Sequence, residues 1–354
     1  MKKFKSGTYI TQDNYKSFQP TPLCRKWCID NMSVLSLLSR ADRCLGRLDM
    51  YSEYIDIELF IQMHIAKEAT QSSKIEGTQT KMGEAFLNKL DVQLERRNDW
   101  EEVQNYIAAM NEAVELLDTL PFSSRLIKQA HKVLLHDVRG QHKQPGEFSH
   151  EIADLMSDIE RFANAQDDDI PDLIKIALIH YQFETVHPFL DGNGRTGRLL
   201  ITLYLISKGI LKRPILYLSD FFERHRMLYY DNLTRVRTHN DIAQWLKFFL
   251  AGIIETAQKG VDTLTAIMRL KQSIEIQTDR LGRRGAYARI LLDHLYRKPV
   301  ISVAEATGLI NKTPQTAYNL MTDMEKLGIV KEITGAQRNK LYSFEPYIHL
   351  FDTL

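Results

Sequence analysis

Twelve consecutive residues near the middle of the chain combine most of the groups that a phosphoryl-type transfer needs. They read His-Pro-Phe-Leu-Asp-Gly-Asn-Gly-Arg-Thr-Gly-Arg and span residues 187–198. Gly192 and Gly194 allow a tight turn whose N–H groups converge on one point. A helix predicted to begin near Arg195 adds the positive end of its dipole at the same point. The segment therefore predicts a nest that suits phosphate oxygens.

Side chains of three chemical kinds accompany this nest. His187 has a pKa range suited to accepting a proton from an attacking hydroxyl. Asp191 is a hard oxygen ligand for the magnesium ion that accompanies ATP. Arg195 and Arg198, three residues apart, share one helix face from which both can reach a polyphosphate. A base, a metal ligand, an anion nest and two cations together indicate a phosphoryl-type transfer site.

Plainer interpretations of the same residues exist. Asp-Gly and Asn-Gly also form tight turns between strands, but the flanking residues here have helical rather than alternating periodicity. A histidine beside a proline is often structural, and arginines three apart are often surface cations. The company of the glycine-rich loop favours the catalytic interpretation of His187.

Nearly every segment around this loop has the period of an amphipathic helix. Apolar residues recur at three- and four-residue steps over 35–48, 55–66, 103–117, 125–135, 152–162 and 173–183. Strand-like alternation is scarce before residue 300. The sequence therefore predicts a mainly α fold with an N-terminal helical region (1–100), a catalytic core (101–257) and a helical connector (258–281).

The pattern changes at Gly282, and residues 282–354 are predicted to form a small domain of their own. Helices are indicated over 286–295, 303–306 and 314–327, with a turn at Gly308, followed by strands over 328–333 and 340–344. This order is typical of a winged helix-turn-helix domain. Such domains often bind DNA, and Arg338 and Lys340 would lie in the wing. From residue 281 onward ten Lys/Arg stand against seven Asp/Glu, so DNA binding, protein docking and homodimer formation all stay open.

The composition is that of an ordinary globular protein. The 46 basic and 45 acidic residues give a net charge of +1, which indicates neither a nucleic acid nor a membrane partner. No apolar run is long enough to span a bilayer, and the N-terminus lacks the apolar core of a signal peptide. Cys24, Cys28 and Cys44 lack the fourth ligand of a zinc site and are read as reduced thiols. We expect a cytoplasmic protein.

Residues 187–198 resemble the signature of the Fic family, which is histidine, proline, phenylalanine, any residue, Asp or Glu, then GNGR, two residues and arginine. The match is complete, and the resemblance extends over most of residues 20–257. It implies an all-helical core. It also implies transfer of AMP from ATP to a Tyr, Thr or Ser hydroxyl of a protein, with pyrophosphate leaving.

The resemblance assigns roles to individual residues. His187 would be the general base, Asp191 would hold Mg²⁺, and Arg198 would orient the γ-phosphate. The nucleotide-binding set would comprise Glu184, Phe189, Leu190, Asp191, Gly192, Asn193, Gly194, Arg195, Arg198, His225, Tyr229 and Tyr230. The last three lie where the family forms its nucleobase pocket, and the alternative is that they are core residues.

A second motif lies far upstream, where Ser72-Ser73-Lys74-Ile75 precedes Glu76-Gly77. It matches the family's inhibitory pattern of Ser or Thr, three residues, Glu, then Gly or Asn. The resemblance implies an N-terminal inhibitory helix on which Glu76 pairs with Arg198. As a bare string the pattern is weak, and a solvated glutamate at a helix C-terminus is the alternative.

The chain departs from the family at one place. Family members usually carry a β-hairpin flap that clamps the target protein ahead of the catalytic helices. Here Pro145-Gly146-Glu147-Phe148 begins the approach, but Ser149-His150 leads directly into a helix predicted from Glu151. Either the flap is short or residues are absent from the sequence.

Three functions remain open from the sequence. The first is AMP transfer to a protein, including the enzyme itself, and the second is removal of AMP with help from Glu76. The third is a DNA-binding regulator whose core senses nucleotide, against which His187 argues, because binding alone needs no base. The target protein, the oligomeric state and the nucleotide donor are also left open.

Overall fold

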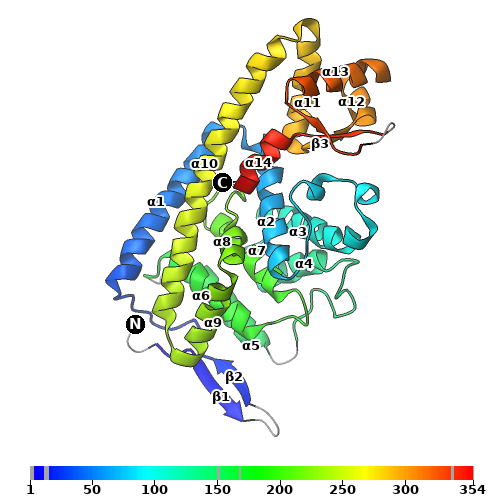
Figure 1. Ribbon diagram of the computed structural model, residues 1–354. Coiled ribbons are helices and arrows are strands. Elements are labelled where there is room, and N and C mark those ends of the chain that lie inside the picture. Colours follow the sequence, from blue (N-terminus) through cyan, green and yellow to red (C-terminus); the bar gives the residue numbers. More distant parts are fainter. Residues whose placement is uncertain (1–3, 12–15, 150–151, 167–168, 336–338, 354) are drawn as a thin grey trace.

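The computed structural model describes the chain except for residues 1–3, 12–15, 150–151, 167–168, 336–338 and 354. The described residues are mainly helical, and their strands are confined to an N-terminal hairpin and the C-terminal module (Figure 1). In that part of the chain no helix is both long and apolar enough to cross a bilayer.

The N-terminal region begins with a hairpin that the sequence analysis missed. Its strands are β1 (Gly7–Thr11) and β2 (Lys16–Pro20), paired antiparallel with Tyr9 opposite Phe18. Each strand is short and mostly exposed, so no apolar alternation marks it. The hairpin extends from the lower end of the molecule in Figure 1.

The helices of the body follow. They are α1 (Met32–Tyr54), α2 (Ile61–Ile75), α3 (Arg97–Leu116), α4 (Ser124–Leu134), α5 (Ala153–Asn164), α6 (Asp172–Val186), α7 (Asn193–Ser207), α8 (Leu218–Arg224), α9 (Arg226–His239) and α10 (Ile242–Asp279). The two longest connections between these helices lie between α2 and α3 and between α4 and α5. The 3₁₀ turns before α3 span Ile57–Leu59, Glu84–Phe86, Lys89–Asp91 and Leu94–Arg96.

Helices α6 and α7 form the centre of the body. Every residue of α6 from 173 to 183 is buried, as is every residue of α7 from 195 to 205. A helix that is buried on all sides must be packed around by other elements. Here α3, α4, α5 and α10 do this, and the Trp245 indole of α10 donates a hydrogen bond of 2.8 Å to the Ala177 carbonyl. The loop between α6 and α7 is thereby held on a rigid support.

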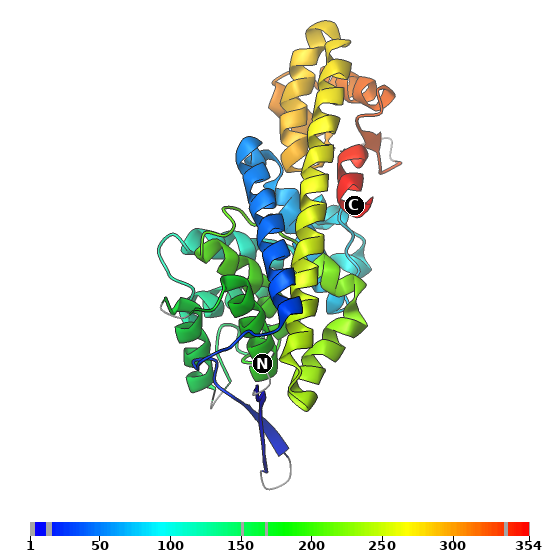
Figure 2. The same cartoon turned by 90° about the vertical axis from the view of Figure 1, so that its left-hand side faces the viewer.

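Helices α1 and α10 lie side by side along one edge of the molecule (Figures 1 and 2). They approach so closely that a Cβ added at Gly260 would lie 2.8 Å from Leu48 Cδ1. Helix α10 is continuous through residue 257, so the core limit expected there falls inside a helix. The connector expected over 258–281 is largely the second half of α10.

The C-terminal module contains the three predicted helices and then the two predicted strands, together with a strand, β3, and a helix, α14, that were not predicted. After a 3₁₀ turn at Gly282–Arg284 come α11 (Gly285–Arg297), β3 (Val300–Ser302), α12 (Val303–Ile310), α13 (Pro314–Lys326), β4 (Lys331–Glu332), β5 (Leu341–Ser343) and α14 (Glu345–Thr353). The strands pair antiparallel in the order β3-β5-β4. The predicted wing residue Arg338 lies outside the described residues.

Two details of this module correct the sequence analysis. The turn expected at Gly308 is wrong, because α12 continues to Ile310 and the chain turns at Asn311, which has φ of 50°. Asparagine tolerates this left-handed conformation and so ends the helix. Helix α14 was not predicted.

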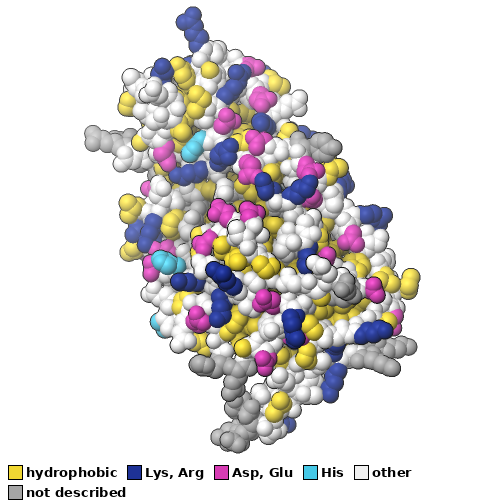
Figure 3. All heavy atoms as spheres, turned by 180° about the vertical axis from the view of Figure 1, so that it is seen from behind, with side chains coloured by type: hydrophobic (Ala, Val, Ile, Leu, Met, Phe, Trp, Pro, Cys, Tyr) yellow, Lys and Arg dark blue, Asp and Glu magenta, His cyan; other side chains and the backbone are white. Residues whose placement is uncertain are grey.

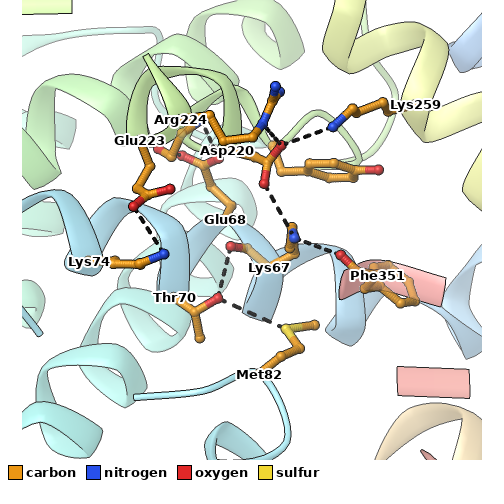
Figure 4. Close-up of polar contacts among 12 residues, drawn as sticks. Lys67, Glu68, Thr70, Lys74, Met82, Asp220, Glu223, Arg224, Lys259 and Phe351 are labelled. Carbon is orange, nitrogen blue, oxygen red and sulfur yellow. Dashed lines mark hydrogen bonds and ion pairs between the residues drawn. The ribbon is translucent and has the colours of Figure 1, made fainter. Parts of the chain in front are cut away.

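Helix α14 returns from the module to the body. Lys67 of α2 donates a 2.6 Å hydrogen bond to the Phe351 carbonyl, and its ammonium lies 3.3 Å from Asp220 Oδ1 (Figure 4). The Phe351 ring meets the His64 ring edge-on at 5.1 Å. The outer face of α2 is thus covered by the C-terminal helix. On the face shown in Figure 3, basic and acidic side chains are interspersed.

Candidate active site

The candidate base lies where α6 ends. His187 is the residue that follows the helix, with φ of 53° and ψ of 61°, and its N–H donates to the Phe183 carbonyl at 2.9 Å. Pro188 cannot continue the helix because it has no N–H to donate. The imidazole is exposed at this end of α6. A substrate hydroxyl can therefore reach it.

The loop between the two helices is braced by a side chain that was predicted to bind phosphate. Asn193 Nδ2 donates to the Phe189 carbonyl at 2.7 Å, and the Phe189 N–H donates to Asn193 Oδ1 at 2.8 Å. Both residues are buried, whereas Leu190 between them is 56% exposed. The Asn193 side chain is thus committed to the shape of the loop, and only its backbone N–H remains for an anion.

The predicted nest is present at the start of α7. Gly192 precedes the helix with φ of 73° and ψ of 7°, and its N–H donates to Asp191 Oδ1 at 2.8 Å. No side chain within the described residues caps this helix end. The first-turn N–H groups therefore point out of the helix without an intrahelical acceptor, as an anion site requires.

Asp191 and Arg195 flank the nest. The Asp191 carboxylate lies 3.4 Å from Lys143 Nζ, and Arg195 forms a buried ion pair of 2.9 Å with Glu102 of α3. Arg195 Nε is buried without a hydrogen-bond partner among the described residues. Burial lowers the pKa of Arg195, although the Glu102 carboxylate opposes this. An anion above the nest would satisfy the unpartnered donor.

The described residues contain no group of three or more His, Cys, Asp or Glu side chains that could hold a metal by themselves. A lone carboxylate such as Asp191 nevertheless fits magnesium that arrives with a nucleotide. Such an ion commonly takes one or two carboxylates from the protein, and phosphates and water supply its remaining ligands.

Arg198 and Glu76 lie together although 122 residues separate them in the chain. Arg198 Nη2 donates to Glu76 Oε1 at 2.7 Å and to the Ser72 carbonyl at 3.0 Å, while Nε donates to Ser72 Oγ at 2.9 Å. Burial opposes the charge of Arg198, but the Glu76 carboxylate outweighs it and the pKa of Arg198 is raised. Burial likewise acts against ionised Glu76, and the charge of Arg198 overcomes it, so the pKa of Glu76 is lowered.

The Glu76 carboxylate also covers the start of α7. A Cβ added at Gly194 would lie 2.3 Å from Glu76 Oε1, so only glycine allows this approach. The carboxylate therefore occupies space directly above the first turn of α7. An anion bound at the nest would have to share that space.

Glu184 faces the same region from α6. A Cβ added at Gly197 would lie 2.4 Å from Glu184 Oε1, which is buried without a partner in the described part of the chain. Burial raises the pKa of Glu184 to about 7, and the charge of Arg198 acts in the opposite direction. Glu184 was predicted to face the pocket. In the structure it lies against α7, close to Arg198.

The three residues expected in a nucleobase pocket differ in their burial. Tyr229 is buried, and its hydroxyl donates to His180 Nε2 at 2.8 Å, because His180 Nδ1 faces the Gly197 carbonyl at 2.9 Å and must carry the ring proton. Tyr229 is therefore a core residue beneath α7. Tyr230 is 41% exposed, and burial and the Glu76 carboxylate raise its pKa. His225 is half-buried against the Phe221 ring, at 4.6 Å.

Two parts of the chain match known protein families. Residues 35–115 match the family described as Fic/DOC family N-terminal, and residues 121–205 match the Fic/DOC family. The chain contains a Fic domain. The match places α2 and Glu76 in the N-terminal family region, and α4 to α7 with most of the site in the Fic domain itself.

Curated proteins similar to part of this chain include several named protein adenylyltransferase Fic. That of Culex quinquefasciatus is 31% identical over 145 residues, which are 39% of this chain and 27% of the relative. That of Nematostella vectensis is 28% identical over 155 residues, or 41% and 34%. The chain thus spans about a quarter to a third of these relatives' length. The crystal structure of a Fic family protein from Desulfovibrio desulfuricans covers 90% of this chain and 98% of its own, with a TM-score of 0.59 and 17% identity, and shares the fold.

Several residues of the Fic domain site escaped the sequence analysis. Glu102 and His131 contact the predicted residues from α3 and α4, at sequence distances of 93 and 60 residues. No local pattern could reveal such contacts. Glu68 of α2 had a signal, because Glu68, Ser72 and Glu76 are spaced by four and share one helix face. Glu68 accepts a 3.0 Å hydrogen bond from the Ser219 N–H, and burial raises its pKa to about 7.

Proposed function

We propose that the chain transfers AMP from ATP to a Tyr, Thr or Ser hydroxyl of a protein, with release of pyrophosphate. The carrying observation is the convergence of one exposed base, His187, with an uncapped helix N-terminus and the buried arginines of α7. The relatives named protein adenylyltransferase support the choice of AMP as the transferred group.

Each group has one task in this reaction. The nest and Arg195 hold the phosphates, and Arg198 takes the γ-phosphate. His187 accepts the proton of the target hydroxyl, whose oxygen attacks the α-phosphorus. The bond from that phosphorus to the bridging oxygen breaks, and pyrophosphate leaves. Mg²⁺ bound with ATP would be held by Asp191 and would neutralise phosphate charge.

We propose further that Glu76 inhibits this reaction. Its carboxylate bonds Arg198 at 2.7 Å and lies above Gly194, so it competes with the γ-phosphate for the same guanidinium. ATP that binds while the pair persists would present its α-phosphate at an unproductive angle. A displacement of about 1 Å can cost on the order of 100-fold in rate.

A second candidate function, removal of AMP from a modified protein, is favoured by the exposure of Glu76. Its side chain is 33% exposed, so one oxygen can meet solvent while the other pairs with Arg198. A carboxylate in this position could orient a water molecule toward the phosphorus of a bound AMP–protein ester.

The test uses the full chain with α-labelled ATP, magnesium and a cell extract. The parent, Glu76→Gly and the double variant Glu76→Gly/His187→Ala are compared by gel autoradiography and mass spectrometry of labelled proteins. We expect label on proteins with Glu76→Gly and none with the double variant. Equal labelling by both variants would remove His187 from the chemistry. Absence of labelling by folded Glu76→Gly, together with loss of AMP from a pre-labelled protein by the parent, would favour removal.

A further inference from the structure

His131, in the last turn of α4, lies beneath the candidate site and has no task in the proposed reaction. It is fully buried, yet both ring nitrogens are hydrogen-bonded. Nδ1 accepts from the Gly146 N–H at 2.8 Å, and Nε2 lies 2.9 Å from the Asp191 carbonyl. Because an N–H only donates and a carbonyl only accepts, the ring carries its single proton on Nε2. One neutral tautomer satisfies both partners.

The ring also supports the loop by direct packing. It stacks on the Phe189 ring with centroids 3.6 Å apart and planes 2° from parallel. A Cβ added at Gly192 would lie 3.3 Å from His131 Nε2. The turn that begins the nest therefore rests on this imidazole.

Gly146, the partner of the other nitrogen, belongs to the segment that precedes the expected position of the flap. Residues 140–149 run along the loop and contact it repeatedly. Lys143 Nζ lies 3.4 Å from Asp191 Oδ2, the Phe148 ring lies 5.1 Å from the Phe189 ring, and the Ser149 N–H donates to the Pro188 carbonyl at 2.8 Å. Gly146 adopts φ of 83°, and a Cβ there would lie 3.1 Å from the Lys128 carbonyl of α4. Both chain segments are thus fixed to α4 at His131.

We propose that His131 is a positioning residue that couples these two segments. Its Nε2–H holds the Asp191 backbone, and so sets the Asp191 carboxylate for magnesium and the Gly192 turn for the phosphates. Its Nδ1 holds Gly146, and so sets the segment along which a target would dock. This inference rests on the proposed function, and it divides the two tasks between the two ring nitrogens.

Two substitutions distinguish the contributions of the two ring nitrogens. The side-chain amide of Asn can place its oxygen near Nδ1, so His131→Asn keeps the acceptor for Gly146 and loses the donor to Asp191. The amide of Gln reaches the position of Nε2, so His131→Gln keeps that donor and loses the acceptor. His136 lies five residues on and is exposed, so His136→Asn and His136→Gln are matched controls.

Binding of α,β-methylene-ATP, which cannot transfer AMP, is measured by calorimetry with and without magnesium in full chains that carry Glu76→Gly. We expect His131→Asn to weaken binding about tenfold with magnesium, where both the Asp191 carboxylate and the Gly192 turn are displaced, and only about threefold without it, where the turn alone contributes. His131→Gln should bind within about threefold of its parent and instead raise the KM for the target protein. Unchanged binding in both variants, or equal losses with and without magnesium, would overturn the proposal.

A measurement without substitution covers the case in which a variant does not fold. Nitrogen-15 NMR of histidine-labelled chain should show a His131 ring protonated at Nε2 and unprotonated at Nδ1, with the Nε2–H signal moving when magnesium is added with α,β-methylene-ATP. Protonation at Nδ1 would contradict the tautomer and the proposal. If the chain that carries Glu76→Gly binds the analogue but labels no protein, the proposed reaction fails while the coupling by His131 stands.

Discussion

Arg198 is a cation that the fold buries almost completely, being 2% exposed, so it needs an anionic partner at every stage. Ser72 supplies two neutral acceptors, and Glu76 supplies the only charge that bonds it directly among the described residues. Any process that removes Glu76 must bring in another anion or leave a buried charge unpaired. The γ-phosphate of ATP meets this need in the proposed reaction.

Glu76→Gly is therefore expected to raise AMP transfer on the order of 100-fold, because Arg198 becomes available to the γ-phosphate. Without nucleotide the variant should melt at a lower temperature than the parent, since a partner of a buried charge is gone. Saturating α,β-methylene-ATP should restore part of the difference. Glu95→Gly, at an exposed site, is the control. A folded Glu76→Gly chain no more active than its parent would contradict inhibition by Glu76.

Asp191→Ala is expected to reduce transfer at least about 100-fold at ordinary magnesium, because the loop has no second hard ligand for the ion. The variant should keep its fold, since the His131 bond goes to the Asp191 carbonyl and not to its side chain. Rate is measured against magnesium concentration, with Asp137→Ala at an exposed position as control. A rate and magnesium dependence equal to those of the parent would assign the ion to another residue.

Some residues of the site could be predicted from one short segment, whereas the positions of others depend on contacts between distant parts of the chain. His187, Asp191 and the two arginines could be predicted because one short segment holds them and their chemistry depends on residue type. Tyr229 was expected in a nucleobase pocket, with a core position as the alternative, and it is buried with a hydrogen bond to His180, 49 residues away. Sequence spacing carries no information about such a contact.

At the scale of elements, α2 both carries residues of the site and contacts the C-terminal helix. One face presents Glu68, Ser72 and Glu76 to α7 and α8, and the N-terminal half of the helix meets α14 through His64 and Lys67. Figure 4 shows Lys67 between Asp220 and the end of α14. Lys74, seven residues further along α2, pairs with Glu223. A change in the cover by α14 would therefore shift the helix that carries Glu76.

Lys67→Met is expected to lower stability by about 1–3 kcal/mol, because a buried ion pair and a hydrogen bond to α14 are lost while Asp220 keeps Arg224 and Lys259. It should also raise AMP transfer several-fold by loosening α2. Lys74→Met is the matched control, since Lys74 lies on the same helix but is 55% exposed. Lower stability with an unchanged rate would show that α2 keeps Glu76 in place without α14.

Helix existence was easier to predict than helix ends. The three- and four-residue period identified α1, α3, α4, α5 and α6, because burial of one face imposes that period. The same period over 55–66 did not reveal that the 3₁₀ turn at Ile57–Leu59 separates α1 from α2. The end of α12 was misjudged because a glycine at a helix position costs only about 1 kcal/mol, which tertiary packing offsets. The exposed hairpin of β1 and β2 buries too little to leave a pattern.

At the scale of the whole molecule, two helices connect the body with the C-terminal module. Helix α10 runs from beside α1 into the module without a break, and α14 returns from the module to α2. A partner that binds the module therefore has a physical route to the helix of Glu76. Some of the side chains along this route are titratable, so the free energy of unfolding depends on pH.

His64 of α2 gives the clearest pH dependence. Both ring nitrogens are buried without partners among the described residues, and burial lowers the pKa of His64 to about 3. Below about pH 6.5 the unfolded chain binds a proton at this position, whereas the folded chain does not until about pH 3. The free energy of unfolding therefore falls as the pH falls through this window, by up to about 1.4 kcal/mol per pH unit.

Glu68 and Glu184 act with the opposite sign. Burial raises the pKa of each to about 7, so between about pH 4.5 and pH 7 the folded chain holds protons that the unfolded chain has lost. Their contribution to stability therefore falls as the pH rises. The total slope of the parent mixes both signs, and only the difference between a variant and its parent isolates His64.

Between pH 6.5 and pH 4.5 the free energy of unfolding of His64→Phe is expected to fall less steeply with falling pH than that of the parent. The difference in slope should be up to about 1.4 kcal/mol per pH unit. The variant should also be at least as stable at pH 7, because an aromatic ring between Tyr217 and Phe351 needs no hydrogen bonds there. Urea unfolding at several pH values measures both effects, with His142→Phe at an exposed site as the control. A variant whose unfolding free energy follows the parent's pH dependence unchanged would mean that His64 is protonated in the folded chain or reaches water. In either case α14 would cover α2 less completely than the contact between His64 and Phe351 requires, and the route from the module to Glu76 would be weaker.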